Sequence, residues 1–203
     1  PTLSSDQSSY LLQAQQSKAQ VVALANSGID TLNTVKTAAE FGIGKAGGQT
    51  LAPLLSLITE IHGMGPQAVG MYLTTGFYWD QDDTTRAFSK RFHERHGKMP
   101  TMMQAAVYSA VLSYLKAIRD SGSDEADTVL KTLRAMEIDD AVVRKGRIRD
   151  DGRLVHDMLL VQVKAPAAGG NGWDLFEIRK TVPGDEAFQP LADSRCPLIK
   201  GTR

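Results

Sequence analysis

Two short stretches of the sequence carry residue types that could bind a metal ion. The stretch "DQDD" at Asp80–Asp83 begins like a calcium-binding loop. However, Thr85 stands at the sixth position, where that loop needs glycine, and Arg91 stands at the twelfth, where it needs glutamate. The stretch "HERH" places His93 and His96 three residues apart, whereas the zinc-protease pattern requires four. Both stretches therefore fit the polar parts of a helix better than a metal site, and no metal is expected.

The glycine-rich stretch "GIGKAGG" matches the G-x-G-x-x-G pattern of dinucleotide sites at Gly42, Gly44 and Gly47. Such a site requires a strand before the glycines and a helix after them, because the N-terminus of the helix faces the pyrophosphate. Here a predicted helix precedes the glycines and a predicted strand follows them. We interpret Gly42 as the residue that ends the helix with a positive φ, and no cofactor is expected.

Composition and charge exclude several classes of partner. The chain has 203 residues, of which 42% are apolar and 23% charged, which is typical of a globular protein with a sizeable core. Its 23 basic and 23 acidic residues cancel, so nucleic acid and anionic lipid are not expected partners. No apolar run approaches the roughly 20 residues that span a bilayer. The chain starts without methionine or a signal peptide, which we interpret as processing or truncation.

The first 80 residues predict alternating strands and helices. Apolar runs with β-branched residues are typical of strands, and apolar residues at helical spacing indicate helices. Strands that are apolar on both faces and alternate with helices predict a parallel sheet covered on both sides. The expected elements are a helix over 8–18, a strand within 19–26, a helix over 31–41 capped by Asp30, a strand over 50–58, a short helical or irregular segment over 59–70 and a strand over 71–77.

The remainder of the chain predicts three helices, a hairpin and a last strand. The helices are expected over 83–97, 100–122 and 123–136, the first capped by Asp82 or Asp83 and the third by Ser123 or Asp124. Asp151-Gly152 is a strong turn signal, and Leu159, Val161 and Val163 alternate beyond it, so 145–166 predicts a hairpin. A short strand over 173–182 and an irregular tail follow.

Three aromatic residues stand side by side at the end of a predicted strand. Phe77, Tyr78 and Trp79 need either a core or a ligand to cover them, because loops are usually polar. Open α/β sheets bind ligands at the carboxyl ends of their strands. Asn26 and Ser27, in the turn after the first strand, are the natural polar contributors at the same kind of position. The alternative for the rings is that they pack a connection against the core.

No pattern in the sequence predicts catalysis. The G-x-S-x-G turn of the serine hydrolases does not occur, and Cys196 is the single cysteine. An enzyme of this fold class would need a cluster of titratable residues at the strand ends, and only Asp80 and His62 lie near them. We therefore expect a protein that binds a ligand without converting it.

Taken in order, four stretches resemble a known family. They are "SSYLLQAQQSKAQVVALANSGIDTLNTVKTAAEFGI", "GFYWD", "TTRAFSKRFHERHGKMPTMMQAAVYSAVLSYLKAI" and "GRIRDDGRLVHDMLLVQVK". Together they resemble the type I periplasmic solute-binding proteins of ABC importers, the branched-chain amino acid binding family. The resemblance runs over almost the whole chain and weakens in the last thirty residues.

The resemblance implies a two-lobed α/β protein with a ligand cleft between the lobes, of which this chain is roughly the C-terminal half. It implies a doubly wound parallel-sheet lobe over residues 1–80, a helical part over 81–147 that returns to the first lobe, and a crossover hairpin with the C-terminal tail over 148–203. The implied partners are a small ligand, a membrane permease and the missing N-terminal lobe of the same protein. The implied location is the periplasm.

One departure from the family bears on the ligand. In the amino-acid binders of this family, the loop after the strand equivalent to 50–58 supplies an acidic residue for the α-ammonium group, whereas this chain has Leu54, Leu55 and Ser56. An unpaired buried ammonium group is costly, so an α-amino acid is disfavoured. Together with the rings of Phe77, Tyr78 and Trp79, this predicts a small aromatic carboxylate as the ligand. Met103 and Gln104 resemble the position from which the other lobe touches ligand. Two alternatives are a branched-chain or other amino-acid binder and a ligand-sensing receptor domain with the same fold.

Overall fold

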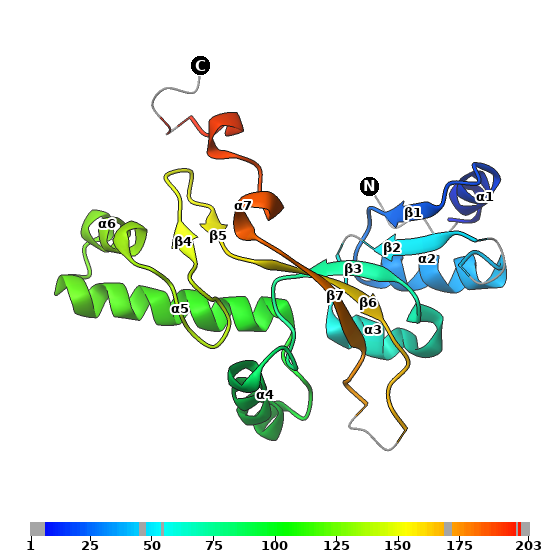
Figure 1. The fold of residues 1–203 in the computed structure, drawn as a ribbon, viewed down its shortest axis with the longest axis horizontal. Helices are drawn as coiled ribbons and strands as arrows, with labels where there is room; N and C mark the ends of the chain where they lie inside the picture. The colour runs from blue at the N-terminus through cyan, green and yellow to red at the C-terminus, as the bar shows by residue number, and fades with distance from the viewer. Residues whose placement is uncertain (1–6, 45–47, 54, 169–171, 198, 200–203) are drawn as a thin grey trace. The chain divides into compact units, whose positions relative to one another are not determined.

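The computed structural model describes residues 7–44, 48–53, 55–168, 172–197 and 199. The chain divides into two units, each described separately below. Unit 1 comprises residues 1–75 and 160–180, and unit 2 comprises residues 76–159 and 181–203. The chain therefore passes from one unit to the other three times (Figure 1). The assignment of these segments to lobes of a larger protein stays a prediction.

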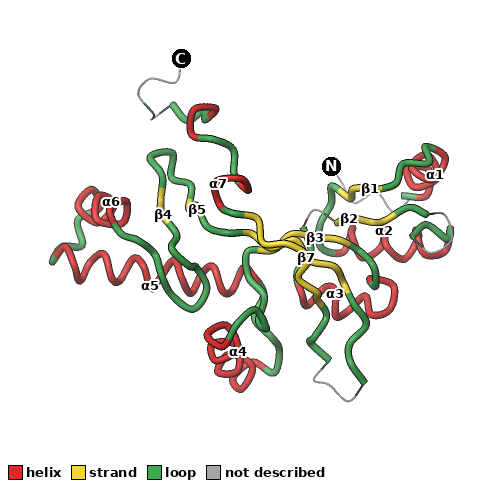
Figure 2. The backbone as a smooth tube through the Cα atoms, viewed as in Figure 1, coloured by secondary structure: helices red, strands yellow, loops and turns green. Residues whose placement is uncertain are grey.

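Unit 1 is built on a strand-helix-strand motif. Strand β1 (Val21–Leu24) pairs in parallel with β2 (Thr50–Pro53), and helix α2 (Ile29–Glu40) connects them. The register places Leu24 opposite Pro53, so the two strands end at the same edge. The other elements of this part are α1 (Ser8–Gln16), α3 (Ile58–Met64), a 3-10 turn (Gly65–Ala68) and β3 (Tyr72–Thr75). The predicted α/β class is confirmed, since Figure 2 shows helices and strands mixed along the chain and β1 and β2 pair in parallel. The expected strand over 50–58 is shorter, because the chain leaves the ladder after Pro53.

The start of α2 differs from the sequence prediction. The expected cap was Asp30, but Gly28 is the N-cap at φ 62° and Asp30 lies in the first turn. A glycine reaches this positive φ without steric cost, so the helix begins earlier than predicted. Asp30 still benefits from the positive end of the helix dipole. The other end agrees, since Gly42 has φ 74° and lies directly after the C-cap of α2, as predicted.

Two further strands, β6 (Met158–Val163) and β7 (Phe176–Val182), join β3 in a second sheet of the order β3, β6, β7. Along β6 the buried residues alternate with half-buried ones, and they are Leu159, Val161 and Val163 as the sequence predicts. This period of two is expected for a strand with one face in the core. The boundary between the units lies within β6 and β7.

Unit 2 is mainly helical. Its helices are α4 (Asp83–His96), α5 (Met102–Ser121), α6 (Ala126–Ala135) and the short α7 (Gly184–Ala187), followed by a 3-10 turn (Leu191–Asp193). Helix α6 packs beside α5 (Figure 1). The predicted hairpin is confirmed in part. β4 (Arg147–Ile148) pairs antiparallel with β5 (Leu154–Val155) around Gly152, but the strand with Leu159, Val161 and Val163, which was expected in the hairpin, pairs in the other sheet.

The cap of α6 was predicted one or two residues too early. Glu125, rather than Ser123 or Asp124, is the N-cap, and its carboxylate accepts hydrogen bonds from the backbone N–H groups of Asp127 (3.2 Å) and Thr128 (2.9 Å). These hydrogen bonds lower the pKa of Glu125. Glutamate is a less common cap than serine or aspartate, which is why the sequence favoured its neighbours.

The core of unit 2 includes a small aromatic cluster. Phe77, Phe88 and Ala105 are buried together, and Trp79 and Met102 pack partly buried against them. The rings of Phe77 and Phe88 meet edge to face, with centroids 5.8 Å apart. This geometry is favourable for aromatic pairs and fixes α4 against the chain that leaves β3.

Helix α5 carries an apolar face that unit 2 leaves exposed. Its exposed side chains include Met103, Val107, Val111, Tyr114 and Leu115. Although α5 has 20 residues, neither it nor any other helix within the described ranges is long and apolar enough to cross a membrane.

Candidate functional site

The predicted site residues of unit 1 follow two neighbouring strands. Asn26 and Ser27 come after β1, and Leu55 and Ser56 come after β2. Because β1 and β2 are parallel and in register, these residues leave the sheet at the same edge, where α/β proteins place ligands. Leu54 lies outside the described residues.

The side chain of Asn26 is held by helix α2. Its Nδ2 donates to Oγ1 of Thr34 (2.8 Å), and its Oδ1 accepts from Oγ1 of Thr31 (2.8 Å). Both threonines are buried, so the amide is fixed in one orientation. Among the described residues the side chain of Asn26 has no further partner, so one N–H and one lone pair remain. The sequence did not predict this network, although two threonines three residues apart on a helix face were its visible signal.

Asn26 also lines a pocket in unit 1. The pocket has a volume of about 480 Å³ and is lined mostly by apolar side chains of α1 and β1, among them Tyr10, Leu11 and Leu24. Thr34 is part of the same lining. Sequence reasoning assigned no role to Tyr10, which is 70% exposed.

Ser56 is the most unusual of the predicted site residues. It is 2% exposed, yet its Oγ has no hydrogen-bond partner among the described residues. An unpaired buried hydroxyl costs about 1–3 kcal/mol, so such groups are rare and often mark a place where a ligand or water binds. Its neighbour Leu55 is 43% exposed, and Ser27 is exposed as well. The described part of this edge thus combines exposed surface with one unsatisfied polar atom.

The three adjacent rings lie in unit 2 and differ in exposure. Phe77 and Tyr78 are each 3% exposed, whereas Trp79 is half-buried. The rings of Tyr78 and Trp79 meet at 65° with centroids 5.9 Å apart. Phe77 packs into the core cluster, as the alternative interpretation of the stretch anticipated. Of the three, Trp79 keeps the most surface for a ligand.

Met103 and Gln104 lie in the first turn of α5 and have different roles. Gln104 forms a capping box with Thr101, in which Oε1 of Gln104 accepts from the Thr101 backbone N–H (2.9 Å). Met103 is 57% exposed and makes part of the apolar face of α5. The helix start therefore fixes Gln104 and leaves Met103 accessible.

The titratable residues near the strand ends are occupied by other contacts. Asp80 pairs with Arg86 at 2.9 Å, and Asp82 caps α4 as predicted. The ring of His62 stacks on Trp173 with centroids 4.3 Å apart. Within the described ranges, no three metal-binding side chains come together.

The sequence and the fold of this chain are similar to those of known proteins. A model of the family described as periplasmic binding protein matches residues 1–171. The chain belongs to the periplasmic binding protein family. The resemblance predicted from the sequence is thereby confirmed. No curated protein matches the sequence of this chain.

Solved structures of periplasmic binding proteins give the same result. A periplasmic binding protein from Burkholderia mallei is 44% identical with a TM-score of 0.88, and the match covers 97% of this chain and 52% of that one. A branched-chain amino acid ABC transporter periplasmic ligand-binding protein from Burkholderia xenovorans LB400 is 41% identical, with a TM-score of 0.88 and coverages of 98% and 53%. The chain therefore spans about half the length of these relatives.

A more distant structure shares the fold alone. The solute-binding protein of an ABC transporter from Rhodopseudomonas palustris BisB5, solved with 3,4-dihydroxybenzoic acid, is 16% identical with a TM-score of 0.74, and the match covers 88% of this chain and 49% of that one. The type I periplasmic-binding fold predicted for this chain is confirmed by the whole set, and the relatives are solute-binding proteins rather than enzymes.

In this periplasmic binding protein, Asp82 is expected to be the most important cap of unit 2. Its Oδ1 accepts from the Thr85 backbone N–H at 2.8 Å, and its carboxylate pairs with Arg144 at 3.2 Å. Replacing Asp82 by alanine is expected to lower the free energy of unfolding by about 1–2 kcal/mol, measured by urea denaturation. The matched control is Asp83→Ala, because Asp83 is fully exposed and contacts only Arg86 among the described side chains. Equal losses in the two variants would contradict the role of the cap.

The same carboxylate predicts the direction of a pH effect. Burial raises the pKa of Asp82, but hydrogen bonds from the Thr85 N–H and from Arg144 outweigh burial, and the pKa is lowered. The stability that Asp82 contributes is therefore complete above its unfolded pKa of about 3.9, and it is lost as the pH falls through the lowered folded pKa. The difference in the free energy of unfolding between the wild type and Asp82→Ala should therefore shrink as the pH falls over that range.

Proposed function

We propose that the protein is the solute-binding component of an ABC importer. It captures a small carboxylate, an aromatic acid, and delivers it to a membrane permease. Membership of the periplasmic binding protein family supports the general role and a periplasmic location. Two relatives are described as ABC transporter binding proteins, one for branched-chain amino acids and one solved with 3,4-dihydroxybenzoic acid.

The ligand class is inferred from the lack of acidic residues at the carboxyl ends of β1 and β2. Neither residues 21–28 nor residues 50–57 contain an aspartate or glutamate. The nearest carboxylate after β2 belongs to Glu60, and it accepts the backbone N–H of Leu57 at 2.9 Å in the capping box of α3. An α-ammonium group bound by these two segments would therefore lose its water without gaining a carboxylate from them, which is unfavourable.

Hydroxyl and amide groups suit a carboxylate ligand. The unpaired Oγ of Ser56 can donate to a carboxylate oxygen, and the remaining N–H of Asn26 can donate a second hydrogen bond. A contact between an aromatic ring of the ligand and a ring of the protein adds about 0.5–1.5 kcal/mol beyond area burial. Micromolar affinity needs about 8 kcal/mol, so a few such contacts suffice. Ligand binding then shifts the whole protein toward the closed form that a permease recognises.

We propose that the missing lobe covers the exposed face of α5. The face, which includes Met103, Val107 and Val111, is an apolar surface of a kind that usually marks an interface. The occupant that fits best is the half of the relatives' length that this chain does not span.

A branched-chain amino acid is the second candidate ligand. It is favoured by the 41% identical relative from Burkholderia xenovorans LB400, which is described as a branched-chain amino acid transporter protein. Its ammonium group would need a carboxylate from outside residues 21–28 and 50–57.

A thermal-shift and calorimetric comparison of benzoate, 3,4-dihydroxybenzoate, leucine and isoleucine on the full-length protein tests the ligand class. The aromatic carboxylates are expected to stabilise the protein by about 2.7 kcal/mol at a hundred times the dissociation constant. Stabilisation by leucine or isoleucine, with no response to the aromatic acids, would favour the second candidate.

Two buried serine hydroxyls that have no hydrogen-bond partner among the described residues provide a matched pair of variants for the same experiment. Ser56 and Ser89 are both buried with an unpaired Oγ among the described residues, but Ser89 lies on α4. Ser56→Ala is expected to weaken binding of the aromatic carboxylate about tenfold, which corresponds to about 1.4 kcal/mol, and Ser89→Ala should leave it unchanged. Neither variant should unfold more easily, because neither loses a hydrogen bond. Equal affinities of the two variants would remove Ser56 from the site.

A further inference from the structure

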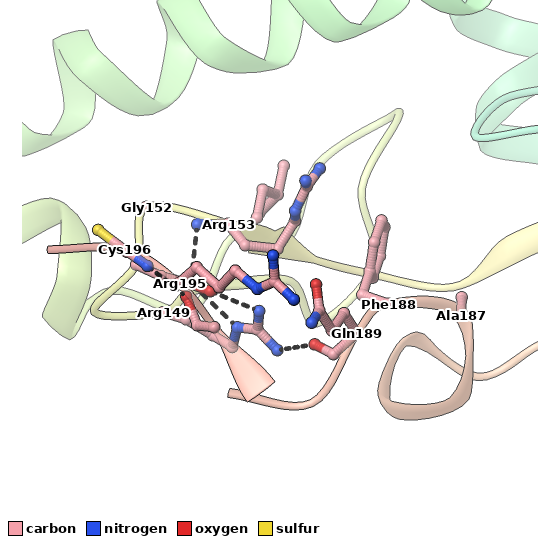
Figure 3. A pocket seen from close by; sticks show the side chains of 11 residues that line it. Arg149, Gly152, Arg153, Ala187, Phe188, Gln189, Arg195 and Cys196 are labelled. Atoms are coloured by element: carbon pink, nitrogen blue, oxygen red, sulfur yellow. Dashed lines mark hydrogen bonds and ion pairs between the residues drawn. The ribbon is translucent and has the colours of Figure 1, made fainter. Parts of the chain in front are cut away.

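Unit 2 contains a second, strongly basic pocket that the proposed function does not use. Its volume is about 440 Å³, and two segments line it: the loop of the β4–β5 hairpin and the chain that follows α7 (Figure 3). The side chains that matter for its chemistry are Arg149, Asp151, Arg153, Phe188, Gln189 and Arg195. None of them belongs to the site residues predicted from the sequence.

One wall of this pocket is a fixed ion pair. Arg149 donates to both carboxylate oxygens of Asp151, with distances of 3.1 Å to Oδ1 and 2.6 Å to Oδ2. Both side chains are largely buried, 15% and 10% exposed, and Arg149 also donates to the backbone oxygen of Gln189 at 2.8 Å. The hydrogen bond from Arg149 lowers the pKa of Asp151. Bidentate geometry of this kind orients the guanidinium group and ties the hairpin to the following chain.

The other two arginines have no such partner. Within the described ranges, neither Arg153 nor Arg195 forms an ion pair through its side chain, so the pocket holds three guanidinium groups against the single carboxylate of Asp151. Figure 3 shows the Arg195 side chain extending into the pocket between Arg149 and Gln189. Unmatched like charges that share one cavity repel one another and attract an anion.

An aromatic ring completes the lining. The guanidinium carbon of Arg153 lies 5.3 Å from the centre of the Phe188 ring, within the range of a cation–π contact. This contact holds Arg153 at the pocket without using its hydrogen-bond donors. The half-buried Phe188 also presents a flat apolar surface beside the cationic groups.

We propose that this pocket binds a small oxyanion, a carboxylate or a phosphate group, through Arg195 and Arg153. Guanidinium groups match the geometry of both oxyanions because their N–H donors form a planar fork. The fixed pair of Arg149 and Asp151 supplies a rigid wall, so this part of the pocket needs no ordering when an anion binds. The site lies wholly in unit 2 and is independent of the proposed transport ligand.

The test is isothermal titration of the protein with sodium phosphate and, separately, with sodium benzoate, at constant ionic strength set by sodium chloride. Arg195→Gln is expected to weaken the binding of the anion about tenfold, because one charge-assisted contact is lost. The matched control is Arg91→Gln, because Arg91 is an exposed arginine of α4 that forms no ion pair with any described residue. The control should bind the anion as the wild type does.

Phe188→Leu distinguishes the two oxyanions. It should weaken benzoate more than phosphate, because benzoate loses the packing of its ring on Phe188 as well as the contact that holds Arg153, whereas phosphate loses only the second. If benzoate also binds at the transport site, that part of the signal should respond to Ser56→Ala and not to Arg195→Gln. Absence of binding by both anions up to about 10 mM, which corresponds to less than about 3 kcal/mol, would overturn the proposal. Equal affinities of Arg195→Gln and Arg91→Gln would do so as well.

Discussion

Replacing Phe88 by alanine is expected to lower the free energy of unfolding by about 3–5 kcal/mol, because the change removes a buried ring and leaves a cavity. Phe88 is 6% exposed and contacts the rings of Phe77 at 5.8 Å and Tyr108 at 4.9 Å between centroids. Both the aromatic contacts and the buried area are lost together. Urea denaturation followed by circular dichroism and by tryptophan fluorescence measures the change.

A neighbouring ring provides the control for this experiment. Phe92 is on the same helix, α4, but is only half-buried, and its centroid lies 6.5 Å from that of Phe88. Phe92→Ala should therefore cost clearly less than Phe88→Ala. If the two variants lose the same stability, or if Phe88→Ala costs under about 1 kcal/mol, the cluster does not hold unit 2 as described.

The order and type of the elements could be predicted from the sequence because they depend on local patterns. The alternation of Leu159, Val161 and Val163 shows one face of a strand directly, and Asp151-Gly152 shows a turn. Asp82 was predicted as a cap because aspartate before a helical pattern accepts a backbone N–H almost regardless of the rest of the fold. Such features are set by residues close in the chain.

The features that could not be predicted from the sequence depend on packing, or on which of several neighbouring residues becomes the cap of a helix. The choice of Gly28 over Asp30 depended on a positive φ, and the choice of Glu125 over Ser123 and Asp124 depended on where the chain turns into α6. The unpaired state of Ser56 is set by what surrounds it in space, and no sequence pattern reports that. Local rules therefore predict elements better than they predict the partners of individual polar atoms.

In the candidate site, the positions of the residues could be predicted from the sequence, whereas the exposure of their side chains could not. Its strand-end positions followed from the α/β pattern, since ligands bind at the carboxyl ends of strands. The exposure of its side chains did not follow, because three adjacent rings in one sequence stretch can face different ways. Phe77 went into the core and Trp79 kept exposed surface, although both stand in the same turn.

Replacing Gly184 by alanine is expected to lower the free energy of unfolding by about 1–3 kcal/mol, the usual cost of overpacking a well-packed region. Gly184 is buried at the start of α7, and its N–H donates to Oδ1 of Asp157 at 3.0 Å. A Cβ atom there would lie 2.8 Å from Cγ1 of Val155 and 2.9 Å from the backbone oxygen of His156. The side chain of Val155 can rotate, but the backbone oxygen cannot move without shifting the chain after β5.

A second glycine separates this steric effect from the general effect of replacing glycine. Gly63 lies within α3, and a Cβ atom there would meet nothing within 4 Å. Gly63→Ala should therefore raise the free energy of unfolding by about 0.5–1 kcal/mol, because alanine loses less backbone entropy in a helix than glycine does. Opposite signs for the two variants in the same urea titration are the expected result. A gain in stability for Gly184→Ala would mean that α7 is not packed against Val155 and His156 as described.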